Sequence, residues 1–79
     1  GFALEVAGEG VRVNAVRPGL IDTPIHARAG MAGRIAKVGP RMPMGRAGQP
    51  EEVARTILWL LSDEASYITG TLVDVGGGA

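Results

Sequence analysis

The chain has 79 residues, of which 46% are hydrophobic and 20% are charged, so it is long enough for one small domain at most and too apolar for a disordered polypeptide. Eight Lys and Arg residues balance eight Asp and Glu residues, and this neutrality lacks the basic excess that a nucleic-acid-binding protein normally carries. With no cysteine and a single histidine, the sequence excludes a disulfide framework, thiolate catalysis and a metal site of Cys or His ligands within one chain.

The longest strongly apolar run covers residues 57–61, which is far too short to span a bilayer. The chain also does not open with the charged and apolar segments of a secretory signal. We therefore expect a cytoplasmic protein with neither a membrane nor a nucleic acid as its partner.

The first elements expected along the chain are a helix end and a strand. Residues 2–7 have the composition of the last turns of a helix, which Gly8 and Gly10 would end in the left-handed conformation. Residues 11–16 alternate and are rich in valine, a pattern typical of a strand. The strand should stop at Pro18, because proline cannot donate to a sheet ladder.

A long segment over residues 24–48 is different in character. Glycine and proline recur throughout it, and short helical turns are expected at residues 25–29 and 32–38. Connections of this length commonly serve as lids or binding loops, so we interpret residues 24–48 in that way.

The clearest helix is expected from Pro50 to Ser62. Proline suits the first helical position, and two glutamates in the first turn complement the helix dipole. Apolar side chains recur at the spacing of one buried helix face, and much of the remaining surface is also apolar, so the helix should be covered on more than one side. The buried stripe consists of Val53, Ile57, Leu60 and Leu61.

A second strand is expected over residues 71–75, which are nearly all β-formers, and the glycines at residues 76–78 should give a flexible end. Strand, helix and strand in this order form a βαβ unit, whose strands are parallel. Such a unit cannot stand alone, because its first strand has an unpaired edge and a parallel sheet needs helices on both faces. We predict an α/β fold with a doubly wound parallel sheet, of which this chain covers only the last two strands and their helices.

Four segments together resemble the short-chain dehydrogenase/reductase family. Residues 13–24 resemble that family's sixth strand and its Pro-Gly…Thr motif, and residues 45–54 resemble the start of its penultimate long helix. Residues 60–70 and 73–78 resemble its closing helix, turn and seventh strand. The resemblance runs over nearly the whole chain in the right order. It implies a Rossmann-type NAD(P)-binding domain, of which residues 1–79 are the C-terminal third.

The family's catalytic pattern does not occur in these residues. No Gly-x-Gly-x-x-Gly phosphate loop follows a strand. Tyr67 does not begin a Tyr-x-x-x-Lys pair, because Thr71 stands four residues later and the only lysine is Lys37. The resemblance implies that the catalytic Ser, Tyr and Lys belong to upstream sequence. We predict no catalytic and no metal-binding residue in this chain, which should be inactive by itself.

Residues 18–23 are the best candidate for a binding site, because open α/β sheets bind ligands at the carboxyl ends of their strands. Gly19 has no Cβ, so a flat ring could approach the backbone, and backbone groups near Ile21 could pair with an amide on that ring. The resemblance identifies the ring as the nicotinamide of NAD or NADP, with the Thr23 hydroxyl near the carboxamide or the pyrophosphate. The predicted cofactor-binding residues are Pro18, Gly19, Ile21 and Thr23.

Structural roles are the alternative at this turn and the expectation at other polar positions. Asp22 or Thr23 could cap a short helix with Pro24 at its first position. Asn14, inside the first strand, should hydrogen-bond neighbouring backbone. His26 lacks the partners of an acid–base catalyst and is expected on the surface or in the lid.

Three further groups have open roles. The arginines could meet an anionic substrate or a cofactor phosphate, although solvated surface is the favoured interpretation. The methionines could line a substrate pocket or pack a lid against the core. Trp59 is expected in the core or at a subunit interface rather than as a ligand platform. The arginines are Arg17, Arg41 and Arg46, and the methionines are Met31, Met42 and Met44.

The resemblance implies an oxidoreductase that transfers a hydride between NAD(P)(H) and a small-molecule carbonyl or secondary alcohol. This chain would supply the nicotinamide-side wall, the substrate lid and an oligomer surface. The implied homo-oligomer, a dimer or tetramer, would form through the helix at residues 50–62 and the strand at residues 71–75. Because no catalytic residue is present, two alternatives stay open: a non-enzymatic interaction or assembly module, and a cofactor-sensing pseudoenzyme of the same fold.

Overall fold

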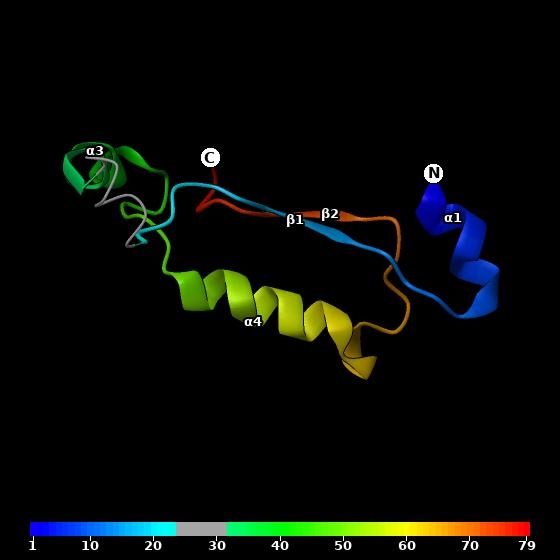
Figure 1. Cartoon of the computed structure of the whole chain (residues 1–79). Helices are drawn as coiled ribbons and strands as arrows, with labels where there is room; N and C mark the ends of the chain where they lie inside the picture. Colours follow the sequence, from blue (N-terminus) through cyan, green and yellow to red (C-terminus); the bar gives the residue numbers. More distant parts are fainter. Residues whose placement is uncertain (24–31) are drawn as a thin grey trace.

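The computed structural model describes residues 1–23 and 32–79, in which two parallel strands form a sheet with a long helix on one face (Figure 1). The helix predicted at residues 32–38 is confirmed, whereas the turn predicted at residues 25–29 lies outside the described residues. The elements follow in the order α1 (Phe2–Val6), the 3-10 turn η1 (Ala7–Glu9), β1 (Ala15–Pro18), α3 (Ala32–Val38), η2 (Gly39–Arg41), α4 (Pro50–Leu61), η3 (Asp63–Ala65) and β2 (Leu72–Val75).

The first strand begins later than its sequence pattern predicts, at Ala15 rather than at residue 11. The residues before it are held by a neighbouring loop through side chains, which replace the ladder bonds of a strand. Asn14 donates from Nδ2 to the Ile68 carbonyl at 3.0 Å and accepts from the Thr71 amide at 3.1 Å. The structural role predicted for Asn14 is therefore confirmed.

The strand stops at Pro18, as predicted, but Pro18 itself is paired opposite Val75, so β1 extends two residues beyond the predicted strand at residues 11–16. The Gly19 amide donates to the Val75 carbonyl at 3.0 Å. Because the donors of successive residues point to opposite edges of a strand, position 18 faces the edge away from β2. The missing N–H of proline therefore breaks no hydrogen bond between the two strands.

The helix α4 covers one face of the sheet and buries Leu60 (Figure 1). Val16 lines a hollow together with α4 side chains, whereas Arg17 alternates onto the opposite face. No element of the described residues covers that opposite face (Figure 1). The helix predicted from Pro50 is confirmed, with Ser62 as the capping residue beyond its last turn.

The chain buries little of its apolar surface. Its accessible surface of 5661 Å² exceeds the roughly 4,500 Å² expected of a compact monomer of this mass. Its radius of gyration is 15.5 Å, against about 12 Å for a compact chain of this length. Both values show that the elements of this chain leave much of their apolar surface exposed. The buried apolar residues are Ile21, Ala47, Leu60 and Ala65.

The glycines at residues 76–78, predicted as a flexible end, form a hydrogen-bonded turn in the structure. Gly77 and Gly78 adopt positive φ angles of 64° and 93°, which glycine tolerates best. The Gly77 carbonyl accepts from the Met44 amide at 3.1 Å, and the Ala79 amide donates to Gly76 at 3.2 Å. Part of the segment at residues 24–48 is thus attached to the end of β2.

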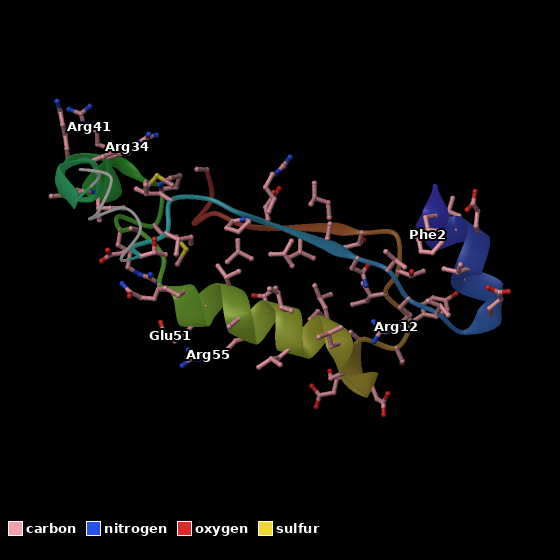
Figure 2. The ribbon with its side chains drawn as sticks, viewed as in Figure 1. Phe2, Arg12, Arg34, Arg41, Glu51 and Arg55 are labelled. Atoms are coloured by element: carbon pink, nitrogen blue, oxygen red, sulfur yellow. The ribbon has the colours of Figure 1, made fainter. Side chains whose placement is uncertain are left out.

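Arg12 fixes the C-terminal end of α4, and Figure 2 shows its side chain beside that end of the helix. Its guanidinium donates to the carbonyls of Leu60 at 2.7 Å, Ser62 at 3.1 Å and Ile68 at 3.3 Å. The last carbonyls of a helix have no partner within the helix, and a cation is favourable there. Arg12 therefore ties α4 to the segment that precedes β1.

None of the helices in the described residues is long and apolar enough to cross a membrane.

Candidate functional site

The four predicted cofactor-binding residues come together at the carboxyl end of β1. They line one shallow groove of about 460 Å³, whose other wall is the first two turns of α4. The lining is almost entirely apolar, with the Thr23 side chain as its only hydroxyl. Such a groove suits a flat ring that is excluded from water on one face. The lining residues are Pro18, Gly19, Ile21 and Thr23 from the strand end and Pro50, Val53, Ala54 and Ile57 from α4.

The backbone of Ile21 carries the most specific feature of the groove. Ile21 forms a parallel bridge with Gly48, but the bonds belong to its neighbours: Gly48 donates to the Leu20 carbonyl, and Asp22 donates to the Gly48 carbonyl, both at 2.9 Å. The amide and carbonyl of Ile21 therefore face the other way. Neither has a hydrogen-bond partner among the described residues, and Ile21 as a whole residue is 8% exposed. A donor and an acceptor on one residue are therefore available to a ligand.

Close packing against the neighbouring strand end explains why position 19 is a glycine, and the sequence alone did not reveal this contact. A Cβ at this position would lie 2.8 Å from the Cα of Gly76, so the ends of β1 and β2 touch backbone to backbone. The prediction gave a different reason, the approach of a ring to the Gly19 backbone. In the structure, the space that a side chain would need is taken by the neighbouring strand end.

An ion pair that the sequence did not predict lies beside the groove. Arg46 donates to Glu52 from Nη1 at 2.8 Å and from Nη2 at 3.0 Å, and Glu52 also accepts from the Gln49 amide at 2.9 Å. These hydrogen bonds, that from Arg46 first, hold the pKa of the Glu52 carboxyl at about 2, below its ordinary value of 4.5. The sequence did contain a signal for the bond between Glu52 and the Gln49 amide, because a glutamate three residues after a helix N-cap indicates a capping box.

The other two predicted arginines have different surroundings. Arg17 pairs with Asp74 on the uncovered face of the sheet, with Nε to Oδ1 at 2.6 Å and Nη2 to Oδ2 at 3.0 Å. The hydrogen bond lowers the pKa of Asp74 and raises that of Arg17. Arg41 makes no ion pair within the described part of the chain and projects outward beside Arg34 near α3 (Figure 2). All three arginines are exposed, so the expectation of solvated surface is confirmed, with Arg17 and Arg46 in surface ion pairs that the sequence did not predict.

The remaining candidates are dispersed. Asp22 is exposed and Thr23 is half-buried, while the helix that they were expected to cap would lie outside the described residues, as do Pro24, His26 and Met31. Met42 is half-buried, and Met44 packs against Gly77. Within residues 1–23 and 32–79, no cluster of His, Asp and Glu could hold a metal ion.

Comparison with known protein families identifies the chain's relatives. The family model described as enoyl-(acyl carrier protein) reductase matches residues 1–79. An oxidoreductase of Escherichia coli K12, YgfF, is 56% identical over 78 residues, which cover 99% of this chain and 32% of that protein. The 3-oxoacyl-[acyl-carrier-protein] reductase FabG of Thermotoga maritima is 48% identical over 77 residues, with 98% and 31% covered. The chain thus spans about a third of the length of the curated relatives it matches.

Solved structures give the same picture. The match to each of the following three structures covers 98% of this chain. Aldohexose dehydrogenase of Thermoplasma acidophilum superposes with a TM-score of 0.87 at 40% identity, over 34% of its chain. A short-chain oxidoreductase of Pseudomonas aeruginosa in an NADPH-bound structure gives 0.83 at 40% identity, over 32%. A 3-oxoacyl-[acyl-carrier protein] reductase of Brucella melitensis with bound NAD gives 0.76 at 45% identity, over 27%.

Proposed function

Because the chain belongs to the short-chain dehydrogenase/reductase family, we propose that it is the C-terminal part of an enzyme that transfers a hydride between NAD or NADP and a small-molecule carbonyl or secondary alcohol. Its relatives are oxidoreductases, and NADPH and NAD are bound in two of the similar structures. The catalytic Ser, Tyr and Lys are supplied by sequence outside these residues. The cytoplasm is the proposed compartment.

The observation that carries this proposal is the unpartnered backbone of Ile21. A nicotinamide carboxamide has one carbonyl oxygen and one NH₂ group, which complement an N–H donor and a C=O acceptor. The bond from Asp22 and the bond to Leu20 hold Ile21 in place without using its own polar groups. These residues therefore fit the cofactor, whose nicotinamide supplies the hydride-carrying carbon when bound.

The groove around Ile21 gives this chain its part in the reaction. Pro18 and the first turns of α4 exclude water from one face of the ring, and the Thr23 hydroxyl can hydrogen-bond the carboxamide or the pyrophosphate. Two hydrogen bonds to the carboxamide fix the rotation of the ring, so the chain determines which face of the ring is turned toward the substrate. The chain thus orients the cofactor rather than taking part in proton transfer.

Two further roles are proposed for surfaces outside the groove. Residues 24–48 form the substrate lid, whose described part includes α3 and is anchored at Met44 and Gly48. The helix α4 and strand β2 form the surface of a homo-oligomer, a dimer or tetramer. Leu58 and Trp59 of α4 are 66% and 42% exposed, and apolar area of this kind is usually covered by another layer or subunit.

Replacing Ile21 by proline in the full-length enzyme tests the proposal. Proline removes the N–H that faces away from Gly48, together with the isoleucine side chain, and deletes neither bridge bond, because these belong to Leu20, Asp22 and Gly48. We expect the affinity for NAD(P)H to fall at least about tenfold, as the loss of one buried hydrogen bond implies. Ile21→Ala, which also loses the side chain but keeps the N–H, is the matched control and should keep a clearly higher affinity than I21P. Unchanged NAD(P)H binding by a folded I21P variant would contradict the proposed seat of the nicotinamide.

A further inference from the structure

The turn at residues 46–49 connects the Arg46–Glu52 ion pair to the backbone of Ile21. The Glu52 carboxylate holds both ends of this turn, since it accepts from Arg46 and from the Gln49 amide. Arg46 Nη1 also donates to the Ala47 carbonyl at 3.1 Å within the turn. One carboxylate therefore sets the conformation of the whole turn through charge-assisted hydrogen bonds, which are stronger than neutral ones.

Gly48, inside this turn, forms both bonds of the bridge to the strand end. It donates to the Leu20 carbonyl and accepts from the Asp22 amide, on either side of Ile21. Gly48 also lies against the Ile21 side chain, because a Cβ on Gly48 would be 2.9 Å from Cδ1 of Ile21. A shift of Gly48 is passed through the two bridge bonds to Ile21, whose amide and carbonyl face away from Gly48.

We infer that Glu52, held by Arg46, is a positioning residue for the nicotinamide: it fixes the turn that presents the Ile21 amide and carbonyl to the carboxamide. The inference rests on the proposed function. Glu52 does not line the groove itself, so it acts through Gly48 and not by contact with the ring. Its carboxylate is charged in the neutral pH range, and the hydrogen bond from Arg46 lowers its pKa further, to about 2.

The test compares two ligands on the full-length enzyme, NAD(P)H and the matching ADP-ribose, which lacks the nicotinamide. Glu52→Gln keeps the size of the side chain but removes the charge and part of the bond to Arg46. We expect E52Q to weaken NAD(P)H about tenfold, since small displacements of a positioned group are costly, and to leave ADP-ribose binding within about twofold. Glu51→Gln, which changes the neighbouring exposed acid in the same helix turn, is the matched control and should alter neither affinity (Figure 2).

Equal weakening of both ligands by E52Q, or no weakening of either, would overturn the inference, because a general structural effect does not select the nicotinamide. Arg46→Lys is the second variant should E52Q fail to fold. It keeps the charge but not the two-pronged geometry, and we expect a smaller loss confined to NAD(P)H. The wild-type enzyme tests the proposed function separately: if it binds ADP-ribose as tightly as NAD(P)H and I21P changes nothing, the seat at Ile21 is wrong.

Discussion

Gly19 and Gly76 meet backbone to backbone at the carboxyl ends of the two strands. A Cβ on Gly19 would lie 2.8 Å from the Cα of Gly76, closer than side chains and backbone approach in proteins. Neither partner can yield easily, because both belong to main chain that is hydrogen-bonded through Val75 and Ala79. The separation of the strand ends beside the groove thus depends on a residue without a side chain.

Gly19→Ala should therefore destabilise the full-length protein by about 1–3 kcal/mol, the usual cost of overpacking. Gly8→Ala is the control, since a Cβ at Gly8 would meet no atom within 4 Å. Urea unfolding monitored by circular dichroism measures both. Equal midpoints for G19A and G8A would show that the strand ends separate without cost.

The Arg46–Glu52 pair should make stability depend on pH in the acid range. The pKa of Glu52 is about 2 in the folded chain against 4.5 ordinarily, so the carboxylate stabilises the fold above pH 4.5. This contribution is lost as the pH falls from 4.5 through 2, because the folded carboxyl then binds its proton. Unfolding of the wild type and E52Q should differ at pH 7 and converge toward pH 2. A difference that stays constant over this range would contradict the assignment.

Arg12→Met should loosen the C-terminal end of α4. The variant keeps the apolar stem but leaves the carbonyls of Leu60 and Ser62 without their cation, which should cost about 1–3 kcal/mol. Arg34→Met, on the exposed side of α3, is the control and should be neutral (Figure 2). Hydrogen exchange of the last α4 amides should accelerate in R12M. If these amides are protected equally in R12M and the wild type, contacts other than those of Arg12 stabilise this helix end.

The exposed apolar side of α4 gives a prediction on assembly. Leu58→Glu places a charge at a position that is 66% exposed in this chain. If the helix forms the proposed oligomer surface, burial of that charge should disfavour association and lower the mass found by light scattering. A fully assembled L58E enzyme would place the interface on another surface.

The repeating patterns of the sequence predicted the extent of the elements well, although in the predicted buried stripe of α4 only Leu60 is buried, while Ile57 is 41% and Leu61 is 74% exposed in this chain. The apolar stripe of α4 and the β-formers of β2 gave these elements to within a residue of their bounds. The start of β1 could not be predicted in this way, since Asn14 satisfies the loop at residues 68–71 through its side chain and ends the regular ladder.

The location of the site could be predicted from the strand pattern. The contacts that shape the site could not, because they join residues far apart in the sequence. The carboxyl end of a parallel strand is a general location for ligands, so residues 18–23 could be chosen from the strand pattern. The bridge from Gly48 to Leu20 and Asp22 joins segments separated by the irregular region. No local pattern encodes that pairing, and it decides which polar groups of Ile21 remain for a ligand.

The most direct test of the central claim is a crystal structure of the full-length protein with bound NAD or NADP. The account predicts that the carboxamide oxygen lies about 3 Å from the Ile21 nitrogen and the carboxamide nitrogen about 3 Å from the Ile21 oxygen, at ordinary hydrogen-bond distance. A nicotinamide ring seated elsewhere, with water or another protein group on both polar atoms of Ile21, would contradict it.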